Sequence, residues 1–164
     1  MNWMILPLKR YFDFSGRSRR KEYWLFILFT FLANIVLSIL DAVLGTLLIF
    51  SGLFGLFVLI PSIAVAVRRL HDTDRSGWWL LAPALLYLVG IALAAGGAVS
   101  AIAAGATNPF GAAAGIALIF MGGALITGLV VFVFLLLDGT RGSNRFGPDP
   151  KDPAGSTDLQ EVFR

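Results

Sequence analysis

The chain has 164 residues, of which 57% are hydrophobic and only 14% are charged, against about 25% charged in soluble domains. Its mean hydropathy of +0.81 reflects more apolar residues than a chain this short can bury in a water-soluble core. The composition therefore predicts an integral membrane protein and excludes most cytosolic enzymes. The chain contains no cysteine, which excludes disulfides, thiolate metal sites and cysteine nucleophiles.

The first half of the chain predicts an interfacial segment followed by two membrane spans. Residues 1–22 mix aromatic and basic side chains, and we expect them to lie on the membrane with their basic groups toward lipid phosphates. The uncharged run 23–40 spans roughly 27 Å as a helix, close to the hydrocarbon thickness. A second span is predicted over about 43–67, kinked at Pro61, whose missing N–H frees a carbonyl of the preceding turn.

The second half of the chain holds a long run without charge. No charged residue occurs from Ser76 to Leu137, and one helix of that length would extend about 93 Å, far more than a bilayer needs. A turn signal at Asn108 and Pro109 divides the run into spans at about 78–97 and 116–137. Two pairs of small residues four positions apart indicate close packing of these spans: Ala92 with Gly96, and Gly111 with Gly115.

The distribution of basic residues predicts the orientation. Of the thirteen Lys and Arg residues, six precede the first span, three separate the second and third, and four follow the fourth. Because short cytoplasmic loops are enriched in Lys and Arg, we expect both termini in the cytoplasm. The predicted fold is an all-α membrane protein whose four transmembrane helices form two hairpins (membrane domain 23–137). The remainder, 138–164, is expected to be a cytosolic tail, disordered after about residue 150.

Three polar segments carry a family resemblance. They read FSGRSRRKEYW from Phe14, RRLHDTDRSGWW from Arg68 and DGTRGSNRFGPDP from Asp138. In this order they resemble domain of unknown function 805, a family of YhaH-like small bacterial inner-membrane proteins, over about residues 2–151. The sequence departs from the family in its long Ala- and Gly-rich stretch at 94–128 and in GTRG, where the family usually has GTPG. The resemblance implies a location in the bacterial plasma (inner) membrane and brings no established activity.

These segments also supply the candidate residues for binding a lipid or a protein partner. They are Arg19, Arg20, Arg68, Arg69, His71, Asp72, Arg75, Asp138, Asn144 and Arg145. We expect Arg68 and Arg69 to complement the negative end of their own helix dipole and to contact lipid phosphates. Asp138 closes the fourth span, where an acidic residue is unfavourable without a cation, so we expect it to pair with Arg68, Arg69 or Arg75.

Two other polar positions allow a functional and a structural interpretation. His71 lies near Asp72 and Asp74, but this cluster lacks a second His or a Glu, so no metal site is expected. Asp41 is the lone acid of the outer half. Inside the membrane it would indicate proton or cation transport, whereas at the turn between the first two spans it would be solvated, and we favour the turn.

Three classes of function fit this pattern. We favour a non-enzymatic membrane component that binds anionic lipid or a protein partner, including a second copy of the chain, through its basic cytosolic face. The alternative is a small transporter or channel that uses Asp41, Asn34 or the kink at Pro61, and a membrane-embedded lipid-modifying enzyme comes third. We find no catalytic motif and expect no cofactor. The predicted membrane topology accounts for the excess of basic residues, so we expect no nucleic acid as a partner.

Overall fold

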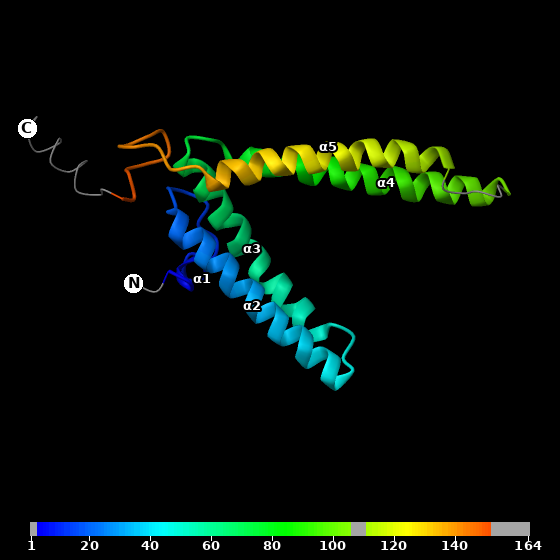
Figure 1. Ribbon diagram of the computed structural model, residues 1–164, viewed down its shortest axis with the longest axis horizontal. Coiled ribbons are helices and arrows are strands. Elements are labelled where there is room, and N and C mark those ends of the chain that lie inside the picture. Colours follow the sequence, from blue (N-terminus) through cyan, green and yellow to red (C-terminus); the bar gives the residue numbers. More distant parts are fainter. Residues whose placement is uncertain (1–2, 106–110, 152–164) are drawn as a thin grey trace, which may run out of the picture. The chain divides into compact units, whose positions relative to one another are not determined.

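The computed structural model describes residues 3–105 and 111–151, and it is all-helical in its regular structure. The elements are α1 (Leu6–Lys9), α2 (Arg20–Leu44), α3 (Ile49–Asp72), the 3-10 turn η1 (Gly77–Leu80), α4 (Leu81–Ala103) and α5 (Gly111–Leu136). Within the described ranges, four helical segments (α2, α3, η1 with α4, and α5) are long and apolar enough to cross a membrane. The predicted all-α membrane fold is confirmed. Helices α2 and α3 lie side by side as one hairpin, and α4 and α5 form a second pair (Figure 1).

The chain divides into two compact units. The first comprises residues 1–77 together with 135–164, and the second comprises residues 78–134. In the first unit, α2 continues to Leu44, past the predicted end at residue 40. It ends at Gly45, whose φ of +67° is a left-handed conformation that glycine adopts without strain. Leu47 and Leu48 also have positive φ, and α3 therefore begins only at Ile49 rather than near residue 43.

Asp41 lies in the last turn of α2 and is only 2% exposed, so the expectation that it is solvated at the turn is wrong. Its carboxylate accepts hydrogen bonds from the backbone N–H groups of Phe50 (3.0 Å) and Ser51 (2.8 Å). The hydroxyls of Thr46 (2.5 Å) and Ser51 (2.7 Å) also donate to it. Because α3 has no side-chain cap at Leu48, Asp41 caps α3 from the preceding helix, where the positive end of the helix dipole stabilises its charge.

Pro61 interrupts the backbone hydrogen bonds of α3, and the N-terminal segment compensates for the loss. A proline has no N–H to donate, so the carbonyl of Phe57, four residues earlier, loses its helical partner. The hydroxyl of Tyr11 donates to this carbonyl at 2.6 Å, and the two aromatic rings lie 5.7 Å apart. Helix α1 also contacts both α2 and α3. The prediction of an interfacial segment did not anticipate this packing against the hairpin.

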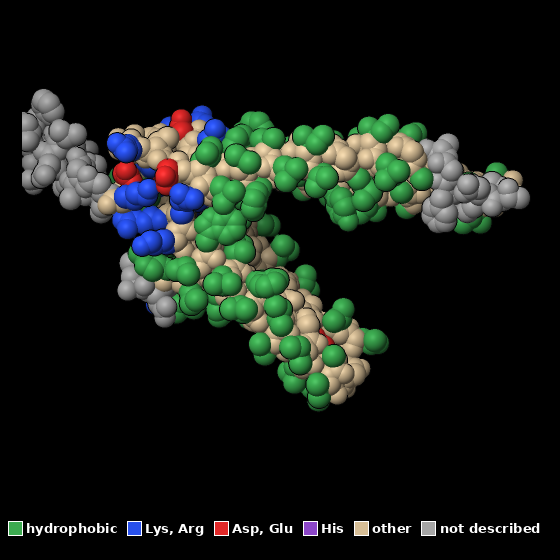
Figure 2. Space-filling model, viewed as in Figure 1, with side chains coloured by type: hydrophobic (Ala, Val, Ile, Leu, Met, Phe, Trp, Pro, Cys, Tyr) green, Lys and Arg blue, Asp and Glu red, His purple; other side chains and the backbone are tan. Residues whose placement is uncertain are grey.

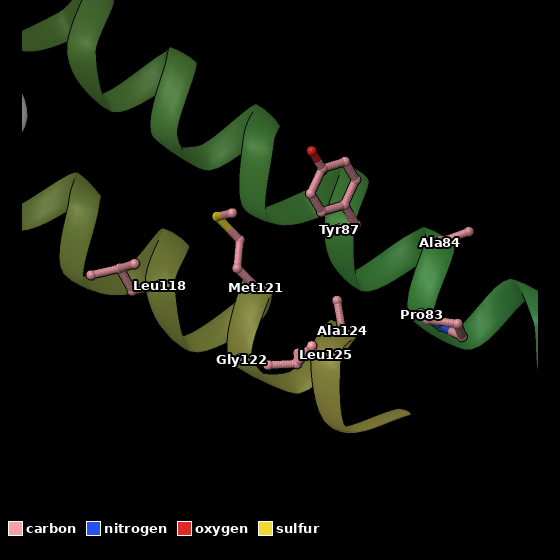
Figure 3. Close-up of a pocket in the computed structure, with 8 residues that line it drawn as sticks. All are labelled: Pro83, Ala84, Tyr87, Leu118, Met121, Gly122, Ala124 and Leu125. Carbon is pink, nitrogen blue, oxygen red and sulfur yellow. The ribbon is translucent and has the colours of Figure 1, made fainter. Parts of the chain in front are cut away.

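In the second unit, α4 and α5 meet at Gly90. A Cβ at this position would lie 3.2 Å from the Cβ of Phe120 and 3.4 Å from the carbonyl oxygen of Ala117, so glycine permits the close approach. A Cβ built on Gly96 or Gly115 meets no described atom within 4 Å, so these two glycines of the predicted small-residue pairs are not the point of contact. An apolar groove of about 720 Å³ between the helices (Figure 3) is lined by Pro83, Ala84, Tyr87, Leu118, Met121, Gly122, Ala124 and Leu125.

The contact between Tyr11 and Phe57 predicts a dependence on Pro61. We expect Tyr11→Phe to lower the free energy of unfolding by about 0.5–1.5 kcal/mol, because the Phe57 carbonyl loses its donor. In a Pro61→Ala background the restored N–H serves that carbonyl, and Tyr11→Phe should have little effect. A double-mutant cycle on the detergent-solubilised protein measures the coupling. An equal effect of Tyr11→Phe in both backgrounds would contradict this account.

Candidate functional site

Most charged side chains of the first unit in view gather at one end of the α2–α3 hairpin, whereas hydrophobic side chains cover most of the hairpin surface in view (Figure 2). We call this end the polar end. Its residues come from three segments: 13–22 around the start of α2, 68–75 around the end of α3, and 138–151 after α5. These segments overlap the three that carry the family resemblance. Two groups of charged residues stand out: a buried cluster and a set that lines an exposed pocket.

Asp72 is the centre of the buried cluster, with only 2% of its surface exposed. Its Oδ1 lies 3.0 Å from Nε and 2.9 Å from Nη2 of Arg17, and its Oδ2 lies 2.5 Å from Nη1 of Arg69. Arg17 also donates to the carbonyls of Gly142 (2.6 Å) and Thr140 (2.5 Å). The backbone N–H of Thr140 donates to the Asp72 carbonyl at 2.8 Å. The three polar segments are thus joined at a single residue.

Arg69 uses its other donors on the end of α5. Its Nε donates to the carbonyl of Leu135 at 3.1 Å, and its Nη2 donates to the carbonyl of Leu137. Helix α5 ends at Leu136, and its last carbonyls have no helical N–H partners. Arg69 lies in the last turn of α3, as the sequence predicted, and its guanidinium also stabilises the negative end of the α5 dipole.

Arg68 is also buried, and it binds the start of α2. Its Nη2 lies 3.1 Å from Oε1 of Glu22, which is itself buried, and its Nη1 donates to the carbonyl of Asp13 at 2.8 Å. The backbone N–H of Ser18 donates to the Arg68 carbonyl at 3.0 Å. Arg68 and Arg69 are both 0% exposed, so the expectation that they contact lipid phosphates is wrong. Their partners are carboxylates and carbonyls because a buried guanidinium requires compensating charge and hydrogen bonds.

His71 and Asn144 dock the segment after α5 on the end of α3. The His71 ring stacks on Phe146 with centroids 3.8 Å apart and planes 3° apart, and its Nδ1 lies 3.2 Å from the carbonyl of Gly16. The Asn144 amide donates to the His71 carbonyl at 2.9 Å. Sequence reasoning included His71 and Asn144 but missed Phe146, an aromatic residue in an otherwise polar segment.

The remaining predicted residues of this region lie nearer the surface. Arg145 and Asp74 form an exposed ion pair, with 3.2 Å between Nε and Oδ1. Arg75 donates from Nη1 to the carbonyl of Thr73 at 3.1 Å. Across the described residues, no group of three or more His, Asp or Glu side chains is placed to hold a metal ion.

Sequence reasoning also missed Arg17, Glu22, Gly139 and Thr140. The acid in the basic run RSRRKE was a signal for Glu22, since a lone carboxylate among cations is a natural ion-pair partner. Gly139 has a different role. A Cβ at this position would overlap the Asp72 carboxylate, so the residue after Asp138 has to be glycine for the chain to pass so close.

A second set of charged residues lines a pocket of about 460 Å³, which we call the basic pocket: Arg19, Arg20, Lys21, Asp138 and Lys151. Asp138 Oδ1 lies 3.0 Å from Arg20 Nη1 and 3.6 Å from Lys151 Nζ. Asp138 therefore pairs with Arg20, not with Arg68, Arg69 or Arg75 as expected, because Arg68 and Arg69 point into the buried cluster. The hydrogen bond from Arg20 lowers the pKa of Asp138 below its usual range.

The tight passage at Gly139 gives a prediction for the buried cluster. We expect Gly139→Ala to lower the free energy of unfolding by about 1–3 kcal/mol, because the added methyl group displaces a carboxylate held by two arginines. Gly55→Ala is the matched control, since a Cβ at Gly55 meets nothing within 4 Å and alanine is the better helix former. Thermal unfolding in detergent measures both variants. Equal midpoints would show that Asp72 does not pack against residue 139.

Comparison with known proteins places the chain in a family. The model of the family described as "Protein of unknown function (DUF805)" matches residues 11–148. The chain is 39% identical to the inner membrane protein YhaH of Escherichia coli K12 over 156 residues, which cover 92% of this chain and 98% of the relative. It is 38% identical to the inner membrane protein YhaI of the same organism over 152 residues, covering 92% and 97%.

A third relative is more distant. The uncharacterized protein YiiR of Escherichia coli K12 is 34% identical over 147 residues, which cover 86% of this chain and 88% of the relative. No solved structure matches the chain. The family match, the similarity to inner membrane proteins over nearly the whole length and the four apolar helices together identify the chain as a bacterial inner-membrane protein of the DUF805 family.

Proposed function

We propose that the protein is a non-enzymatic component of the inner membrane that binds the headgroups of anionic lipids in the basic pocket. The observation that carries this proposal is the gathering of Arg19, Arg20, Lys21 and Lys151 around one open pocket. Guanidinium and ammonium groups bind phosphate oxygens, and Arg does so with two parallel hydrogen bonds. A volume of about 460 Å³ lies within the usual range of small-ligand pockets.

The position of the pocket on α2 supports a lipid as the ligand. Arg19 is the N-cap of α2 and its own side chain makes no capping hydrogen bond, so three of the pocket residues, 19–21, stand at the positive end of the helix dipole. The Arg19 guanidinium also lies over the ring of Trp3, 5.6 Å from its centroid. Tyr23 and Trp24 lie in the first two turns of α2, and such aromatic residues suit the headgroup boundary. The basic pocket would thus lie at the level of lipid phosphates.

The geometry of Asp41 gives no support to the transporter alternative. Its two carboxylate oxygens accept four hydrogen bonds from Thr46, Phe50 and Ser51. A transport acid has to exchange its partners for a proton or a cation, whereas Asp41 is engaged in capping α3. Lipid binding is therefore the function that the described residues support best.

The proposal predicts that two arginines of the pocket retain anionic lipid. We expect Arg19→Gln with Arg20→Gln to reduce the phosphatidylglycerol and cardiolipin that co-purify with the protein by about tenfold or more, since each charge near an anionic surface contributes about 1 kcal/mol. Mass spectrometry of extracted lipids, relative to phosphatidylethanolamine, measures the change.

The matched control removes the same charge elsewhere on the polar end. Arg141→Gln with Arg145→Gln also removes two positive charges, from exposed residues that do not line the basic pocket. It should leave most of the anionic lipid bound. Equal losses in the two double variants would mean that the basic residues act only as diffuse charge, and unchanged lipid in both would refute the proposal.

The proposal also requires the polar end to face the cytoplasm, as the distribution of Lys and Arg predicts. Because the chain has no cysteine, single cysteines at Ser15, Asn108 and Ser143 report the side of each position without background. Only Asn108→Cys, which lies outside the described residues, should react with a membrane-impermeant thiol reagent in cells with a permeable outer membrane. Labelling at Ser15→Cys or Ser143→Cys would show that the polar end faces the periplasm and would contradict the predicted orientation.

A further inference from the structure

One wall of the basic pocket carries a negative charge. Asp138 is 71% exposed, and it lies between Arg20 and Lys151, the two cations that its carboxylate contacts. It follows the end of α5 by two residues, at a helix terminus that disfavours an acid. The carboxylate is therefore held by the cations of the basic pocket, while α5 itself contributes no favourable interaction with its charge.

The contacts of Asp138 are those that a phosphate would make. A phosphate oxygen and a carboxylate oxygen accept the same hydrogen bonds from Arg and Lys, with similar geometry. An anionic headgroup that enters the basic pocket meets Arg20 and Lys151 already paired, and it has to replace Asp138 to engage them. Because exposed ion pairs are weak, this replacement is feasible.

We propose that Asp138 is a resident counter-ion that an anionic lipid headgroup displaces from Arg20 and Lys151, so that it limits the affinity of the basic pocket for phosphate. This inference rests on the proposed lipid binding and assigns a regulation to the same site. With Asp138 in place the pocket carries four positive charges and one negative charge, a net charge of +3. Because the headgroup has to replace Asp138, it binds more weakly and more reversibly than it would bind to the four cations alone.

The test measures lipid affinity in a variant that removes the counter-ion but keeps its shape. Full-length protein in detergent is titrated with phosphatidylglycerol, and native mass spectrometry counts the bound lipid. We expect Asp138→Asn to raise the affinity about fivefold, the factor that corresponds to one unit charge near the membrane surface. Asp138 is exposed and its ion pairs contribute little to folding, so the variant should fold normally.

Two comparisons separate displacement from a general charge effect. Asp74→Asn also removes one exposed carboxylate that pairs with an arginine of the polar end, but Asp74 does not line the basic pocket. It should raise the affinity clearly less. In an Arg20→Gln background the effect of Asp138→Asn should shrink, because the main contact for which carboxylate and phosphate compete is gone. Equal effects of Asp138→Asn and Asp74→Asn, or an undiminished effect without Arg20, would overturn the inference.

The same titration separates this inference from the proposed function. If Arg19→Gln with Arg20→Gln leaves lipid binding unchanged, the basic pocket is not the lipid site and both proposals fail. If that variant loses lipid while Asp138→Asn leaves the affinity unchanged, only the displacement fails. Competition by glycerophosphoglycerol, the same headgroup without acyl chains, shows whether the ligand is a lipid or a soluble phosphate. If glycerophosphoglycerol displaces the lipid at a concentration comparable to that of the lipid itself, the ligand is a soluble phosphate and the lipid assignment is wrong.

Discussion

The carboxylate of Asp72 is the contact on which the polar end depends. It is buried between the guanidiniums of Arg17 and Arg69, and these arginines also hold backbone carbonyls at the end of α5 and beyond it. A buried ion that loses its counter-charge destabilises a protein by about 3–5 kcal/mol. The segment that follows α5 therefore cannot leave the end of α3 without depriving two buried arginines of partners. Segments from the beginning, middle and end of the sequence are stable only together.

Burial separates two groups of charges at the polar end that have different roles. The buried group contains Arg17, Arg68, Arg69, Glu22 and Asp72, which together carry one excess positive charge. Carbonyl oxygens at the end of α5 and beyond it accept hydrogen bonds from these arginines and stabilise that charge. These residues have no access to a ligand, and their role is to join the segments. The second group lines the basic pocket, whose net charge of +3 remains available to an anion. A composition of thirteen basic residues does not reveal this division.

Side chains from distant segments also complete the hydrogen bonding of the hairpin backbone. Asp41 of α2 accepts hydrogen bonds from the first turn of α3, and Tyr11 donates to the carbonyl that Pro61 leaves open. A bilayer offers no water for such groups, so each has to be satisfied by the protein. The second unit lacks charged residues altogether between 78 and 134, and its two helices meet through apolar and small residues such as Gly90.

The sequence by itself determined the membrane class, the four apolar helices and the family, because hydropathy, the lengths of uncharged runs and short polar motifs are local properties. Tertiary structure alone decided the partners of the charged residues. The pairing of Asp138 with Arg20 rather than Arg69 depends on which side chains point inward where α3 and α5 end. Likewise, Asp41 is buried because α3 begins beside it. Ion pairs and caps form between groups far apart in sequence, and the direction of a side chain is set only when the helices pack.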